Sequence, residues 1–153
     1  MTRVSEAIRP LDGEENRALI RRLSDEGRLW GAADALRTAF LAATDDGVLA
    51  GFVALEQGTA ATLLRSLYVE PARRGRGLGR RLVETVEAEA SRRGTRRVCL
   101  FSTEAGGYFL RLGYSAVPVA EVVEAAAATP QVEWIVQRPE VLAAEVAFAK
   151  ELV

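Results

Sequence analysis

The stretch "ARRGRGLGRRL", residues 72–82, carries Gly75, Gly77 and Gly79 at alternate positions among five arginines. Glycine is unfavourable in the interior of both strands and helices, so three in close succession indicate that something approaches the backbone there. Residues 78–93 repeat apolar side chains at helical spacing and predict a helix. The first-turn amides of a helix have no intrahelical partners and lie at its positive end, so the stretch predicts a phosphate site.

The bulk composition restricts the class of protein. The 153 residues are 49% hydrophobic and 27% charged, and the net charge is −1. We therefore expect one globular domain over residues 1–153, with the arginines forming a local basic patch. The near-neutral charge, and the lack of aromatic residues beside that patch for base stacking, argue against a nucleic-acid partner.

No apolar run is long enough to span a bilayer, and the first ten residues lack the apolar core of a signal peptide. Cys99 is the only cysteine, which fits a reducing compartment. We expect a cytoplasmic protein that has no membrane partner.

The sequence contains no histidine. Its absence excludes Ser-His-Asp and Cys-His catalysis as well as histidine metal sites, and we expect no metal. In an enzyme of this composition, a carboxylate, a tyrosine, a water molecule or the cofactor must handle protons.

Apolar runs separated by turn residues predict the order of strands and helices. Strands are expected at residues 3–10, 39–44, 48–57, 61–69, 96–101, 113–117 and 132–137. Helices are expected at residues 12–26, 30–39, 78–93, 104–112, 120–129 and 139–153. Three antiparallel strands in succession, followed by a strand–helix–strand crossover, indicate a mixed sheet.

Two common phosphate-binding patterns do not fit. The Walker pattern needs a lysine that this loop lacks, and the dinucleotide pattern G-x-G-x-x-G fails at Arg80. The dinucleotide fold also begins with its βαβ unit, whereas here three antiparallel strands come first.

The pattern Arg74-x-x-Gly77-x-Gly79 resembles the pyrophosphate-binding signature of the GNAT superfamily of acyl-CoA-dependent N-acetyltransferases. Residues 68–94 are similar to that family's fourth strand and third helix, and residues 105–117 to its later helix and sixth strand. The resemblance covers residues 40–118. It implies an α/β (α+β) fold with a mixed, mostly antiparallel sheet of six to seven strands flanked by helices.

Within the superfamily, "LLRSLYV", "GRGLG" and "YFLRLGY" look most like the small acetyltransferases associated with arsenic-resistance operons. The Cys-Pro-containing C-terminal strand typical of those proteins is missing.

The resemblance implies that acetyl-CoA is the co-substrate and lies in a cleft where the fourth and fifth strands separate. Pantetheine is expected on the backbone of Leu67, Tyr68 and Val69. The pyrophosphate is expected on the amides of Arg74, Gly75, Arg76, Gly77, Leu78, Gly79 and Arg80. Two departures concern positions that contact coenzyme A in the family: Ser102 replaces an asparagine, and Phe109 replaces the tyrosine that protonates the leaving thiolate.

The implied reaction is direct transfer of an acetyl group to the primary amine of a small molecule. Because Phe109 cannot donate a proton, water or the substrate ammonium must protonate the thiolate. Glu56 is the first candidate for a base and Glu104 the second, and each has the alternative of being a solvated surface carboxylate. Arg65 either faces the substrate cleft, where it holds an anionic group of the acceptor, or is an edge arginine.

Two further possibilities remain open. The chain is alternatively a GNAT-like module that binds acyl-CoA, or regulates a partner, without catalysis. The apolar stripe of the predicted helix at 139–153 packs in the core or contacts a second copy of the chain. The resemblance separately implies a possible homodimer, since dimers are common in the family.

Overall fold

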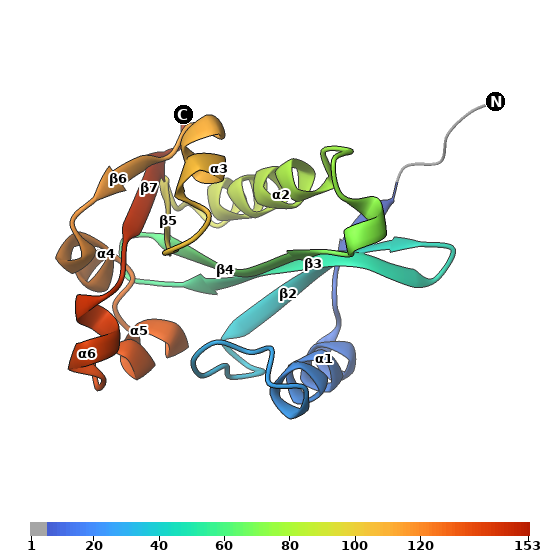
Figure 1. Ribbon diagram of the computed structural model, residues 1–153, viewed down its shortest axis with the longest axis horizontal. Helices are drawn as coiled ribbons and strands as arrows, with labels where there is room; N and C mark the ends of the chain where they lie inside the picture. The colour runs from blue at the N-terminus through green and yellow to red at the C-terminus, as the bar shows by residue number, and fades with distance from the viewer. Residues whose placement is uncertain (1–5) are drawn as a thin grey trace.

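A seven-stranded mixed sheet organises the part of the chain that the computed structural model describes, residues 6–153 (Figure 1). Its strands lie in the order β1-β2-β3-β4-β5-β7-β6. β4 and β5 pair in parallel, and the other neighbouring strands pair antiparallel. The strands are β1 (Ala7–Pro10), β2 (Thr38–Asp45), β3 (Val48–Gln57), β4 (Thr62–Val69), β5 (Arg97–Phe101), β6 (Ser115–Val117) and β7 (Ala147–Glu151).

Helices cover both faces of the sheet (Figure 1). They are α1 (Gly13–Asp25), α2 (Leu78–Arg92), α3 (Gly106–Arg111), α4 (Val119–Ala125), α5 (Pro130–Ile135) and α6 (Pro139–Ala143), with a short 3₁₀ turn η1 (Pro71–Arg73) before α2. Alternation along β3 assigns the faces: Val53 and Leu55 pack with α2, whereas Phe52 and Ala54 pack with α1. α4 and α5 pack on the α1 face. No helix in residues 6–153 is long and apolar enough to cross a membrane.

The predicted start of the first helix is confirmed in detail. The Glu15 amide donates to Asp12 Oδ1 at 2.8 Å, and the Asp12 amide donates to Glu15 Oε1 at 3.1 Å. This reciprocal pair is a capping box, which satisfies two backbone donors that the helix cannot pair internally. Of the predicted edge strand at 3–10, β1 forms the part from Ala7 onward, and residues 3–5 lie outside the described residues.

The fourth strand separates from the fifth halfway along its length. β4 pairs with β5 at Thr62 and Leu63, and within residues 6–153 no strand pairs with it on that side beyond Leu63. On its other side the register with β3 shifts, and Ser66 at this bulge has a left-handed φ of 59°. A bulge bends its strand, so β4 leaves an open edge at the middle of the sheet.

The prediction of a helix at 30–39 is wrong. Residues 28–37 form a loop that ends in a turn, and β2 begins at Thr38. The Asp34 side chain accepts a hydrogen bond from the Leu36 amide at 2.9 Å, which favours a local turn over a helix. The Trp30 carbonyl, which a helix would use internally, accepts a hydrogen bond from Arg65 at 2.8 Å.

The two C-terminal predictions are also wrong. The expected strand at 132–137 is largely helix α5, because Thr129 caps the Val132 amide and Pro130 occupies the first turn. The expected helix at 139–153 stops after α6, and the chain continues as β7 between β5 and β6. The helical stripe at 139–153 is therefore absent, and β7 packs in the sheet.

Candidate active site

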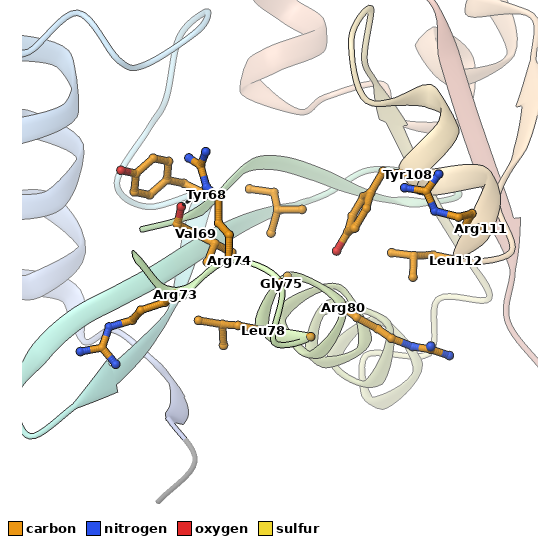
Figure 2. Close-up of a pocket in the computed structure, with 13 residues that line it drawn as sticks. Tyr68, Val69, Arg73, Arg74, Gly75, Leu78, Arg80, Tyr108, Arg111 and Leu112 are labelled. Atoms are coloured by element: carbon orange, nitrogen blue, oxygen red, sulfur yellow. Dashed lines mark hydrogen bonds between the residues drawn. The ribbon is translucent and has the colours of Figure 1, made fainter. Parts of the chain in front are cut away.

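The loop that carries the three glycines opens into a cavity of about 610 Å³ between β4, α2 and α3 (Figure 2). We call it the glycine-loop cavity. Figure 2 shows Tyr68 and Arg74 on one side of it and Tyr108 and Arg111 across from them. Its lining residues are Leu67, Tyr68, Val69, Arg73, Arg74, Gly75, Gly77, Leu78, Gly79, Arg80, Tyr108, Arg111 and Leu112.

The backbone at the start of α2 explains two of the glycines. Gly75 and Gly77 have left-handed φ values of 79° and 80°, which side chains rarely permit. Gly77 is the N-cap of α2, and no side chain caps the helix there. The first-turn amides are thus open to the cavity, and nothing lies within 4 Å of where a Cβ of Gly77 would be. This is a geometry that accepts phosphate oxygens.

The glycine at position 79 has a different structural reason. It is helical, and a Cβ added to it would lie 2.6 Å from the Tyr108 hydroxyl oxygen. α3 therefore presents Tyr108 to the first turn of α2, and a side chain at position 79 would require the phenol to move. Burial raises the pKa of Tyr108, so its hydroxyl stays protonated at neutral pH.

The arginines of the loop divide into two groups. Arg73 forms an ion pair with Asp45 at 2.7 Å, and Arg81 reaches Glu6 at 3.3 Å, so both fasten the loop to the body of the protein. Arg74 donates from Nε to the Val69 carbonyl at 2.8 Å and stays exposed beside the cavity. Arg80 forms an exposed ion pair with Glu84 at 3.7 Å, one helical turn further along α2.

Most of the residues predicted to bind a cofactor come together in this cavity, but three of them lie elsewhere. Arg76 is exposed on the loop and is not part of the lining. Phe109 is buried in the core with 4% exposure. Ser102 accepts a hydrogen bond from the Ala105 amide at 3.0 Å and lines a neighbouring cavity.

Sequence reasoning missed four residues of the lining: Arg73, Tyr108, Arg111 and Leu112. Tyr108 and Arg111 lie three residues apart on α3, so the helical period could have placed them on one face. Which face of α3 meets the cavity depends on the packing of Phe109 in the core.

A second, polar cavity of about 510 Å³ adjoins the first, and Leu67 lines both. Its other lining residues are Arg28, Trp30, Arg65, Ser66, Phe101, Ser102, Thr103, Glu104, Gln131 and Glu145. The two cavities thus meet at the bulge of β4, where the strand leaves β5. A ligand in each could bring reacting atoms together at that point.

Glu56 and Arg65 form a buried ion pair at 3.0 Å, with side chains 0% and 1% exposed. Glu56 is therefore not the solvated carboxylate that was one of its predicted alternatives. Arg65 is not an edge arginine either: it reaches the wall of the polar cavity, but its guanidinium is held by protein groups. Burial lowers the pKa of Arg65, and the carboxylate of Glu56 opposes that shift.

Two other carboxylates line the polar cavity. Glu104 is exposed, as expected for the loop after β5. Glu145 is half-buried; burial raises the pKa of its carboxyl group, and the Val146 amide opposes that shift. Sequence reasoning missed Glu145 because its place depends on the pairing of β7 with β5. Just before β7, the Ser102 amide donates to the Val146 carbonyl at 2.9 Å.

Among residues 6–153, no three or more cysteine, aspartate or glutamate side chains are grouped so that they could hold a metal ion.

Comparison with known proteins gives the same fold. A sequence model of the family described as the acetyltransferase (GNAT) domain matches residues 36–116. No curated protein sequence matches the chain significantly.

Several solved structures share the architecture. N-acetylglutamate synthase from Neisseria gonorrhoeae, complexed with coenzyme A and N-acetyl-glutamate, has a TM-score of 0.71 and 22% identity, and covers 99% of this chain. The chain spans only 36% of that synthase. Rv2747 from Mycobacterium tuberculosis, in complex with CoA and NLQ, has a TM-score of 0.70 and 18% identity, with coverage of 96% and 99%.

An aminoglycoside 6'-N-acetyltransferase complexed with coenzyme A has a TM-score of 0.60 and 19% identity, with coverage of 96% of this chain and 97% of that one. At these identities the likeness is one of fold.

Proposed function

The chain belongs to the acetyltransferase (GNAT) domain family, and on that premise we propose that it transfers an acetyl group from acetyl-CoA directly to the primary amine of a small molecule. The observation that carries the proposal is the uncapped N-terminus of α2, which opens through left-handed glycines into the glycine-loop cavity.

The residues that line that cavity suit coenzyme A. The pyrophosphate lies on the first-turn amides of α2 and the amides of the glycine loop, with Arg74 and Arg80 nearby to balance its charge. The pantetheine arm follows the open edge of β4 toward Leu67. Arg76, Ser102 and Phe109 have no direct part in this arrangement, because they lie outside the cavity lining.

The acceptor occupies the polar cavity, so its nitrogen meets the thioester carbonyl near Leu67. The carboxylates of Glu104 and Glu145 favour an ammonium group there. After one proton leaves the ammonium, the nitrogen forms a bond to the carbonyl carbon and the C–S bond breaks. The new amide gives up a second proton, and the thiolate gains one from water or from substrate ammonium. A backbone N–H at the β4 bulge stabilises the oxyanion.

Glu104 and Glu145 are the carboxylates placed to receive the first proton. Glu56 is poorly suited to this role, because its two oxygens already accept hydrogen bonds from Thr38, Arg65 and the backbone amide of Gln131. The enzyme therefore acts chiefly by bringing the two reactants together.

The proposal is tested by titrating coenzyme A in a calorimeter, and by measuring free-thiol release from acetyl-CoA with a panel of primary amines. A matched pair of variants locates the site. Gly77→Ala and Gly94→Ala each force alanine into a left-handed conformation at the two ends of α2, and neither added Cβ meets an atom within 4 Å. Both cost about 1–2 kcal/mol of stability.

Only Gly77→Ala should weaken coenzyme A binding, by about tenfold or more, because only Gly77 lines the cavity. Equal affinities in the two variants, or no heat with the unmodified protein, would count against the site.

A second candidate is an acyl-CoA-binding or regulatory module without catalysis. It is favoured by the burial of Phe109, which leaves the position of the family's proton-donating tyrosine inside the core. Coenzyme A binding without thiol release on any amine would support this second candidate.

The remaining expectations are proposals of the same kind. They are kinship with the arsenic-resistance-associated acetyltransferases, a single domain over residues 1–153, a cytoplasmic location, and no nucleic-acid or membrane partner. A homodimer is also open, and light scattering after size-exclusion chromatography tests it.

A further inference from the structure

The guanidinium of Arg65 joins parts of the polar cavity that are distant in sequence. Its Nη2 donates to the Trp30 carbonyl at 2.8 Å, and its Nη1 donates to the carbonyl of Ala32, both in the loop between α1 and β2. Its Nε reaches the Ser66 hydroxyl at 3.4 Å, at the bulge of β4. Trp30 and Ser66 both line the polar cavity, so Arg65 sets the distance between two of its walls.

Glu56 extends the same network to a third wall. Its Oε2 accepts hydrogen bonds from the Thr38 hydroxyl at 2.5 Å and from Arg65 at 3.0 Å. Its Oε1 accepts a hydrogen bond from the backbone amide of Gln131 at 3.0 Å. Gln131 belongs to α5 and lines the polar cavity. One ion pair thus connects the loop at 28–37, the bulge of β4 and the start of α5.

The energetic cost of this pair indicates that it does more than hold the core together. Two charges removed from water lose solvation that their attraction often fails to restore, and apolar side chains of similar volume are frequently as stabilising. What an apolar pair cannot do is hold carbonyl and amide groups at fixed positions. The groups so held belong to the polar cavity, to the adjoining loop at Ala32 or to β2 at Thr38, and none of them lines the glycine-loop cavity.

We propose that Arg65 and Glu56 are positioning residues for the acceptor: together they fix three walls of the polar cavity against the β4 bulge, and they take no part in binding acetyl-CoA. The inference rests on the proposed function, in which the acceptor amine occupies that cavity.

Three variants break the network to different degrees. Glu56→Gln keeps the shape but places an amide donor among three donors that point at this side chain. Arg65→Met removes every hydrogen bond, and Arg65→Lys restores the charge without the planar fork. Glu87→Gln is the control. Glu87 is a partly buried carboxylate that accepts hydrogen bonds from Tyr114 at 2.8 Å and from Lys150 at 3.2 Å, and it lines neither cavity.

Each variant is measured in three ways. Hydrogen exchange compares the peptide at 28–38 with the peptide at 71–82. Calorimetry gives the affinity for coenzyme A. Steady-state kinetics with the most active amine of the panel gives KM for the amine and for acetyl-CoA separately.

We expect faster exchange at 28–38 and unchanged exchange at 71–82 in Glu56→Gln and Arg65→Met. We also expect a KM for the amine raised by about tenfold or more, with KM for acetyl-CoA and the affinity for coenzyme A within about twofold. Arg65→Lys should recover part of the loss, and Glu87→Gln should change none of these values.

Unchanged exchange at 28–38, or equal effects on both KM values, would overturn the positioning role. If Arg65→Met does not fold, Glu56→Gln and Arg65→Lys still decide the matter. If the unmodified protein neither binds coenzyme A nor acetylates an amine, the proposed function fails, and the exchange at 28–38 still decides whether the ion pair holds the loop.

Discussion

Replacing Gly79 by alanine should create a clash with one identifiable atom, the hydroxyl oxygen of Tyr108. The added Cβ would lie 2.6 Å from that oxygen, whereas ordinary van der Waals contact begins at 3.4 Å. The next atom of the phenol, Cζ, would be 3.6 Å away, which is an ordinary contact. Removing the hydroxyl by Tyr108→Phe therefore removes the clash, and the two substitutions should be strongly coupled.

The free energies follow from two opposing effects. Alanine in a helix is favoured over glycine by up to about 1 kcal/mol, and less in a first turn. Overpacking costs about 1–3 kcal/mol. Gly79→Ala alone should therefore range from neutral to about 3 kcal/mol less stable. In the Tyr108→Phe background the same change should be neutral or stabilising, which gives a coupling energy of about 1–3 kcal/mol.

The assay is urea denaturation of the four proteins of this double-mutant cycle, with coenzyme A affinity measured in parallel. The Tyr108 ring can escape the clash only by turning, and it lines the glycine-loop cavity, so Gly79→Ala should also weaken coenzyme A binding. The double variant should bind about as tightly as Tyr108→Phe alone. A coupling energy below about 0.5 kcal/mol would refute the steric reasoning.

Three other experiments test the fold: two substitutions and one labelling measurement. Gly51→Ala would put a Cβ 2.6 Å from the carbonyl oxygen of Tyr68, a backbone atom of β4 that cannot easily move. The free energy of unfolding should therefore fall by about 1–3 kcal/mol, and an unchanged urea midpoint would contradict this. Burial raises the pKa of the Cys99 thiol to about 12. A disulfide reagent should therefore label Cys99 slowly at pH 7, and the labelling rate should rise about tenfold per pH unit. Rapid labelling of the native protein at pH 7 would contradict this expectation. Asp12→Ala removes the acceptor for the Glu15 amide and should cost about 1 kcal/mol in the same urea experiment, whereas no loss would show that the cap is unimportant.

The features that could be predicted from the sequence depend on neighbours a few residues apart. The α2 helix follows from an apolar period of 3.6 residues, and its N-terminus from the glycines that precede it. The turn at Asp46 and Gly47, both at positive φ, follows from the residue types that tolerate that conformation. The capping box of α1 follows from two side chains three residues apart.

The features that could not be predicted depend on partners far along the chain. β7 has a sequence compatible with a helix, and it becomes a strand because β5 and β6 both pair with it. This placement carries Glu145 to the polar cavity. Glu56 and Arg65 are unremarkable within their own strands, and they become an ion pair because the register of β3 and β4 makes them diagonal neighbours.

The sequence by itself determined a glycine loop that leads into the uncapped start of a helix, because this feature is built from backbone groups and needs only the right residues within one short stretch. The tertiary structure alone decided which side chains face each cavity. A side chain such as Tyr108 or Phe109 turns toward the cavity or the core according to what packs against it, and a buried charge such as Glu56 is tolerated only where distant donors converge on it.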